Sequence, residues 1–88
     1  MIDITLASLE IEFTKRAEKE LYAFSKKERD RIAKGIDGLM NGLSGDVKKL
    51  TNYHPEYRLR IGSYRVLFGI ENNSVIVIYR ISHRQSAY

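Results

Sequence analysis

The feature that most constrains this chain is a change of hydrophobic periodicity at its single proline, Pro55. Before Pro55, apolar residues recur at the three- and four-residue spacing of amphipathic helices. After Pro55, apolar and polar residues alternate through residues 56–61, 64–71 and 74–82, which is the period-two pattern of strands. The sequence therefore predicts helices followed by a three-stranded meander, an arrangement of the α+β class.

The first half of the chain contains one predicted strand and two predicted helices. Residues 8–13 alternate strictly and favour a strand. Thr14 can cap a helix that follows at once. Ser25, with Glu28 three residues later, has the spacing of a capping box at the start of a second helix, whose apolar residues recur as far as Leu43. We expect this helical hairpin to pack on one face of an antiparallel sheet.

Two short connectors, at residues 62–63 and 72–73, predict tight hairpin turns between the three later strands. With two-residue turns at both places, Arg60 lies opposite Arg65, and Arg65 lies opposite Arg80. The three arginines then form a row on one sheet face. The other face, which we expect the helices to cover, carries the apolar residues Tyr57, Leu59, Ile61, Tyr64, Val66, Phe68, Ile70, Val75, Val77, Tyr79 and Ile81.

A row of three guanidinium groups is costly for a sheet, because like charges that face each other across strands are destabilising. Only two acids, Glu56 and Glu71, lie in the three later strands. A polyanion would benefit from the row, since each guanidinium presents a planar fork of donors suited to phosphate oxygens. The row therefore indicates a face that binds nucleic acid, whereas a single arginine would indicate only a solvated surface.

The distribution of charge supports an anionic partner. The net charge is +4. Residues 1–46 carry eight Lys and Arg against nine Asp and Glu, a net charge of −1, whereas residues 47–88 carry seven against two, a net charge of +5. A basic half of this kind fits nucleic acid, an acidic protein or a membrane surface.

Several classes of protein are disfavoured by what the sequence lacks. There are no cysteines, so disulfides and thiolate chemistry are excluded. No apolar run approaches the roughly 20 residues that span a membrane, and the acidic Asp3 and Glu10 argue against a signal peptide. No glycine-rich phosphate loop or metal-ligand spacing occurs. We therefore expect a cytoplasmic protein that uses no metal or cofactor and does not bind membranes.

The last residues add groups that could act beside the arginines. His83 can titrate near neutrality and serve in acid–base chemistry. Arg84 adds a cation, and Tyr88 can stack on an unpaired base. Lys48 and Lys49 either extend the basic surface or are solvated lysines of a loop.

Two blocks of this sequence resemble the RelE branch of the RelE/ParE toxin superfamily. The first is YRLRIGSYRVLF at residues 57–68, with Lys49 and Leu50 before it, and the second is the ending HR…Y within residues 81–88. Together with the order of elements, the resemblance covers nearly the whole chain. It implies one RelE-like domain over residues 1–88, acting as the toxin of a type II toxin–antitoxin pair.

The resemblance also implies a reaction. RelE-like toxins enter the ribosomal A site and cut the messenger RNA, as the ribose 2′-hydroxyl attacks the neighbouring phosphate without a metal. Arg65 matches the family arginine that stabilises the charged transition state. Arg84 matches an arginine that supports the leaving group or holds phosphate, and Tyr88 matches a tyrosine that stacks on or orients the substrate.

Two positions depart from the family pattern. Arg58 and Arg60 stand where well-known RelE-type enzymes carry lysines. Because arginine is effectively never deprotonated, neither can act as a general base. The resemblance makes His83 the best candidate for that role, because some relatives use a histidine near this end. Arg58 and Arg60, with Arg80, Lys48 and Lys49, are expected to bind the RNA backbone.

Three functions are compatible with the resemblance. The first is the ribosome-dependent endoribonuclease, the second is a ParE-like inhibitor of DNA gyrase, and the third is an inactive relative that still binds an antitoxin. All three imply a RelB-like antitoxin as partner, with operator DNA bound only through the antitoxin complex.

Overall fold

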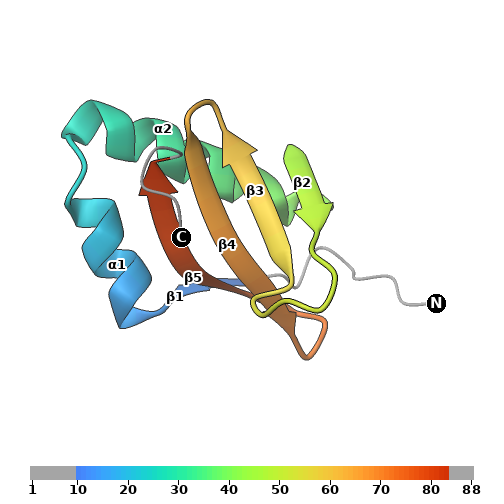
Figure 1. Ribbon diagram of the computed structural model, residues 1–88. Helices are drawn as coiled ribbons and strands as arrows, with labels where there is room; N and C mark the ends of the chain where they lie inside the picture. The colour runs from blue at the N-terminus through green and yellow to red at the C-terminus, as the bar shows by residue number, and fades with distance from the viewer. Residues whose placement is uncertain (1–9, 84–88) are drawn as a thin grey trace.

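The structure of the protein, a computed structural model, describes residues 10–83 (Figure 1). Its elements in chain order are β1 (Glu10–Phe13), α1 (Lys15–Tyr22), α2 (Lys26–Asp37), the short 3-10 helix η2 (Gly38–Met40), β2 (Asp46–Lys49), β3 (Tyr57–Ile61), β4 (Tyr64–Glu71) and β5 (Val75–His83). The predicted order of strand, helical hairpin and three-stranded meander is confirmed. β2 is an additional strand in a segment that the sequence indicated only as a loop.

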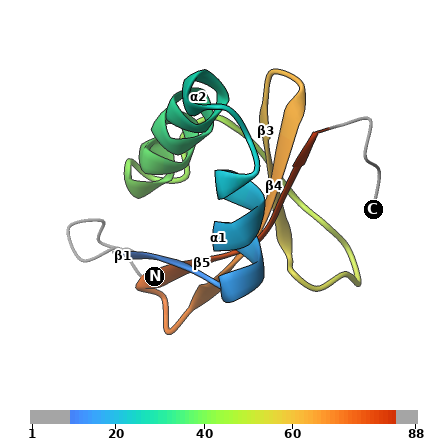
Figure 2. The same cartoon turned by 90° about the vertical axis from the view of Figure 1, so that its left-hand side faces the viewer.

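The strands form one sheet in the order β1-β5-β4-β3-β2. β2, β3, β4 and β5 are antiparallel neighbours, but β1 pairs with β5 in parallel. The expectation of a wholly antiparallel sheet is therefore wrong at this edge, where β1 joins a strand far from it in sequence. Both helices lie on one side of the sheet, and the other side, which faces the viewer in Figure 1, is called the open face (Figures 1 and 2).

Both predicted helix caps are present. Thr14 Oγ1 accepts a hydrogen bond from the Ala17 amide at 3.1 Å at the start of α1. At the start of α2, Ser25 and Glu28 form the reciprocal capping box, with bonds of 3.0 and 3.2 Å. The second helix ends earlier than its apolar spacing predicted, because the chain tightens into η2 after Asp37.

The first hairpin has the predicted register. Ile61 pairs with Tyr64, Arg60 with Arg65, and Tyr57 with Phe68. The Tyr57 and Phe68 rings stack at 5.2 Å on the helix side. Gly62 adopts the positive φ of 57° that the turn requires.

The second hairpin departs from the predicted register in two places. The turn spans residues 72–74, one residue more than predicted, so Glu71 pairs with Val75 and not with Ser74. A bulge then shifts the pairing again, so that Phe68 pairs with Ile78 while Leu67 pairs with Arg80. A bulge adds one residue to one strand and so reverses the face on which the following side chains lie.

These two shifts exchange the faces of part of β5. Ile76 and Ile78 are fully buried in the core with the helices, although the sequence placed them on the open face. Val77 pairs with Gly69 and belongs to the open face, as does Tyr79. Past the bulge, the face reverses again and Ile81 returns to the core as predicted.

The core lies between the helices and the sheet. Its fully or nearly fully buried residues are Ala17, Ile32, Ile36, Leu39, Leu59, Tyr64, Val66, Phe68, Ile76, Ile78 and Ile81. α2 approaches β3 closely at Gly35, where an added Cβ would stand 2.5 Å from Ile61 Cδ1. Among the described residues, no helix is long and apolar enough to cross a membrane.

Candidate functional site

The open face carries two adjacent rungs of paired residues near the β3–β4 turn. The first rung crosses from β2 to β5 as Asp46, Arg60, Arg65 and Ser82. Directly paired residues project from the same side of a sheet, so the two guanidinium groups share the open face. The Arg60 side chain is exposed, and Arg65 is partly buried. The predicted pairing of Arg60 with Arg65 is therefore confirmed.

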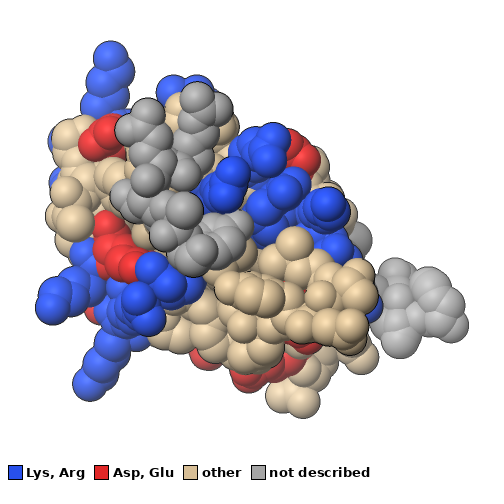
Figure 3. Space-filling model, viewed as in Figure 1, with Lys and Arg blue, Asp and Glu red and all other residues tan. Residues whose placement is uncertain are grey.

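The second rung crosses the same strands as Lys48, Arg58, Leu67 and Arg80. The Arg58 side chain is only 15% exposed, and its guanidinium lies 3.7 Å from Asp46 Oδ1. Arg58 Nε is buried without a hydrogen-bond partner within residues 10–83. Lys48, Arg58, Arg60 and Arg65 thus lie on the same two rungs as the acid Asp46. We call Lys48, Arg58, Arg60 and Arg65 the arginine cluster; Figure 3 shows basic side chains gathered over β2 and β3.

Arg80 does not complete a row with Arg60 and Arg65, and that prediction is wrong. The two register shifts move Arg80 one rung along β5, opposite Leu67. Its Nε donates to both carboxylate oxygens of Glu20, at 3.0 and 3.3 Å. Figure 3 shows basic side chains near α1 that are separate from those over β2 and β3.

Glu20 supports the edge of the sheet as well as pairing with Arg80. β1 pairs only with residues 75–78 of β5, so the rest of that edge needs other partners. Glu20 Oε1 accepts from the Ile81 amide at 2.8 Å, and Glu20 Oε2 lies 3.6 Å from Arg16. Glu20 therefore ties α1 to β5 and holds Arg80 in place.

Lys49 and His83 are not brought to the arginine cluster. Lys49 pairs with Tyr57, whose ring lies on the helix side, so Lys49 projects away from the open face. His83 pairs with Tyr64, and their rings meet edge to face at 5.5 Å. Since Tyr64 packs among the helices, the His83 ring lies on the opposite side of the sheet from Arg65.

The environment of His83 is a small polar network at the start of α2. Tyr64 Oη donates to Glu28 Oε2 at 2.8 Å. The Ser25 backbone amide, followed by the Tyr64 hydroxyl, lowers the pKa of Glu28, and the same bond to Glu28 raises the pKa of Tyr64. This network anchors α2 to the end of the sheet.

Arg84 and Tyr88, the two expected site residues of the tail, lie outside the described residues. Within residues 10–83, no group of three or more His, Cys, Asp or Glu side chains is arranged to hold a metal ion.

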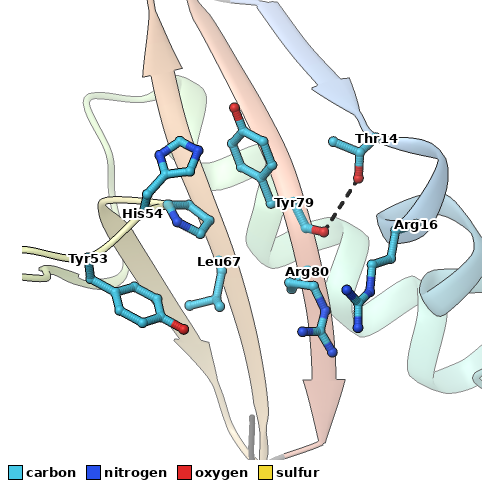
Figure 4. A pocket seen from close by; sticks show the side chains of 8 residues that line it. Thr14, Arg16, Tyr53, His54, Leu67, Tyr79 and Arg80 are labelled. Carbon is cyan, nitrogen blue, oxygen red and sulfur yellow. Dashed lines mark hydrogen bonds between the residues drawn. The ribbon is translucent and has the colours of Figure 1, made fainter.

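Sequence reasoning missed a pocket of about 440 Å³ on the open face. It is lined by Thr14, Arg16, Tyr53, His54, Pro55, Leu67, Tyr79 and Arg80, most of which Figure 4 labels. His54 is not among the residues that the sequence indicated as functional, and Tyr79 was expected on the face that the helices cover. The register shift at the β4–β5 turn brings Tyr79 to this side, and no local signal in the sequence marks that shift.

Comparison with known proteins identifies relatives of this chain. Residues 11–88 match the family model described as the ParE toxin of the type II toxin–antitoxin system parDE. Toxin RelE3 of Methanocaldococcus jannaschii is 46% identical over 50 residues, which cover 56% of this chain and 54% of that protein, so the matched stretch spans about half of the relative.

Two solved structures extend the match over nearly the whole chain. The RelB–RelE antitoxin–toxin complex from Methanococcus jannaschii contains a chain 32% identical to this one, with a TM-score of 0.71 and coverage of 88% of this chain and 94% of that chain. The archaeal RelE–RelB complex from Pyrococcus horikoshii gives 26% identity, a TM-score of 0.71 and coverage of 91% and 99%. The chain therefore belongs to the RelE/ParE superfamily of toxins from type II toxin–antitoxin systems, and within it to the RelE family.

Proposed function

We propose that this toxin is a ribosome-dependent endoribonuclease that cuts messenger RNA in the ribosomal A site and so inhibits translation. The observation that carries the proposal is the arginine cluster. Lys48, Arg58, Arg60 and Arg65 share a sheet face that the helices leave open, with Asp46 as the acid on their rungs. A fold gains nothing from opposing guanidinium groups, whereas a phosphodiester gains charge-assisted hydrogen bonds.

The proposed reaction needs charge stabilisation more than it needs a metal. The 2′-oxygen attacks the adjacent phosphorus, the bond to the 5′-oxygen breaks, and a 2′,3′-cyclic phosphate and a 5′-hydroxyl form. Arg65 would stabilise the negative charge that develops on the phosphoryl oxygens. Arg58 and Arg60 would hold the flanking phosphates, and Arg84 would support the leaving group. Tyr88 would stack on a nucleobase of the substrate.

The proton of the 2′-hydroxyl needs an acceptor that the arginines cannot provide. His83 lies across the sheet from Arg65, against Tyr64, so we propose that His83 is not this acceptor. The acceptor is then a group of the ribosome–message complex, which would make cleavage depend on the ribosome.

The partner of this toxin is proposed to be a RelB-like antitoxin. The related chains from Methanococcus jannaschii and Pyrococcus horikoshii are found in complexes with RelB. We propose that an acidic segment of the antitoxin covers the arginine cluster, and that operator DNA is bound only through the antitoxin complex. If the affinity for the antitoxin changed neither with salt concentration nor with the Arg60→Ala substitution, the arginine cluster would not be its binding surface.

A second function is supported by the family model that matches, because its description is that of a ParE toxin. A ParE-like toxin would inhibit DNA gyrase and leave messages intact. The two functions differ in what accumulates in a treated cell: cleaved messages in the first case and gyrase-linked DNA breaks in the second.

Primer extension on a defined message in a bacterial translation reaction tests the proposal. The wild-type protein is compared with Arg65→Ala and with Lys34→Ala, which changes an exposed lysine on α2. We expect discrete A-site cuts with the wild type and Lys34→Ala but not with Arg65→Ala. An absence of cuts by folded wild-type protein on translating ribosomes would refute the nuclease function and favour gyrase.

A further inference from the structure

The pocket beside the arginine cluster is built from four separate parts of the chain. Thr14 and Arg16 come from the start of α1, and residues 53–55 come from the loop before β3. Leu67 lies on β4, and Tyr79 lies on β5 with Arg80. Its volume, about 440 Å³, is in the usual range for a small-molecule site.

The inner surface of the pocket contains buried apolar side chains. Leu67 is 2% exposed, and Pro55 is buried beside it. The rings of Tyr53, His54 and Tyr79 stand around them (Figure 4). Aromatic rings with polar edges suit a planar heteroaromatic ring better than a flexible aliphatic chain.

Tyr79 is held in its position by three neighbours. The His54 ring meets it edge to face at 5.2 Å. Its hydroxyl donates to Glu71 Oε2 at 3.2 Å. An added Cβ at Gly69 would stand 3.4 Å from Tyr79 Cε2, an ordinary contact distance, so the Tyr79 ring packs over this glycine. The platform is therefore present before any ligand binds, and a ligand need not order it.

One end of the pocket is cationic. Arg16 and Arg80 lie next to each other there in Figure 4, and both contact Glu20. Two guanidinium groups share one carboxylate, so this end keeps a net positive charge. The contact with Glu20 uses Arg80 Nε, and the other guanidinium nitrogens of Arg80 remain in position to meet a phosphate.

The pocket adjoins the arginine cluster through one residue. Leu67 pairs with Arg58 on one side and with Arg80 on the other. A single strand that places its phosphate over Arg58 thus has the pocket next to it on the same face. We propose that this pocket binds one unpaired nucleobase of the RNA substrate, with the neighbouring phosphate at Arg16 and Arg80.

This inference rests on the proposed function, since the pocket would be part of the same RNA-binding face. Base stacking on an aromatic ring is tolerant of sequence because every base has a π-face. The pocket would therefore fix the register of the message at the arginine cluster, and its polar edges would give a modest preference among bases.

The test is binding of a non-cleavable 2′-O-methyl hexanucleotide, followed by fluorescence anisotropy, and it needs no ribosome. Tyr53 is 45% exposed, so Tyr53→Ala should leave the fold intact, and Tyr53→Phe keeps the ring. We expect Tyr53→Ala to weaken binding of the hexanucleotide by at least about fivefold, whereas Tyr53→Phe should bind it as tightly as wild type. The slope of affinity against salt should not change, because no phosphate contact is removed.

A second set of oligonucleotides identifies the base. In a series of hexanucleotides, each member lacks the base at one position. We expect one member to bind wild-type protein more weakly than the intact hexanucleotide, and its affinity should not change further in Tyr53→Ala. Arg58→Ala should instead weaken every member and reduce the salt slope. These results would hold even if the protein cut no message, so the two proposals can fail separately.

Two outcomes would overturn the inference. The first is that neither Tyr53→Ala nor any abasic position in the oligonucleotide weakens binding, while Arg58→Ala does. The face would then bind only the RNA backbone. The second is that Tyr53→Ala weakens binding of the antitoxin but not of the oligonucleotide, which would make the pocket a protein-docking site.

Discussion

Arg60 and Arg65 lie directly opposite each other across the β3–β4 hairpin, with both side chains on the open face. Like charges in this position oppose folding. We expect Arg60→Ala to raise the free energy of unfolding by a few tenths of a kcal/mol, up to about 1 kcal/mol. Urea unfolding at low salt measures the change, and high salt should shrink it. A loss of stability in Arg60→Ala would mean that Arg60 supports the fold.

Glu20 is expected to be a structural residue despite its place on the surface of α1. Glu20→Ala removes the acceptor of the Ile81 amide and the partner of Arg80. We expect a loss of about 1–3 kcal/mol in the free energy of unfolding. Lys19→Ala, an exposed neighbour, should change it by less than about 0.5 kcal/mol. Equal effects of the two substitutions would contradict the role of Glu20 at the β5 edge.

The register of β5 after the β4–β5 turn can be tested by comparing two neighbouring truncations. Ile78 is fully buried beneath the helices, whereas Val77 lies on the open face and is 8% exposed. Ile78→Ala should cost about 2–5 kcal/mol. Val77→Ala should cost about 1–1.5 kcal/mol. Chemical denaturation of both variants shows which substitution costs more stability, and a larger cost for Val77→Ala would support the register that the sequence predicted.

The Glu28 network predicts a dependence of stability on pH. The pKa of Glu28 is below its ordinary value of 4.5, chiefly because its carboxylate accepts from the Ser25 amide. A lowered folded-state pKa means that the stabilisation is complete above about pH 4.5 and is lost as the pH falls through the folded value. Stability measured from pH 7 downward should fall less steeply in Glu28→Gln. Parallel curves for the variant and the wild type would contradict this assignment.

The fold could be predicted in outline because its signals are local. The capping box of Ser25 and Glu28 marked the second helix, and the Gly62-Ser63 turn set the register that pairs Arg60 with Arg65. β2 gave no such signal, since Asp46–Lys49 is short and has only Val47 partly buried.

The candidate site was harder to predict because it depends on a non-local event. The register shift at the β4–β5 turn brings Tyr79 to the open face. Arg80 leaves the expected row because that shift is followed by a bulge in β5. Its cause is the need to bury both Ile78 and Ile81 under the helices, which becomes evident only when the whole sheet is assembled. The same packing placed His83 against Tyr64, away from Arg65.

The most direct test of the account is single-turnover cleavage of the message on ribosomes programmed with one A-site codon. The rate with wild-type toxin is compared with those of Arg65→Ala, Arg60→Ala and the Lys34→Ala control. The account predicts a loss of about 100-fold or more for Arg65→Ala, a smaller loss for Arg60→Ala and none for the control, with 5′-hydroxyl ends on the products. Equal rates for Arg65→Ala and wild type would contradict the claim that the arginine cluster carries the reaction.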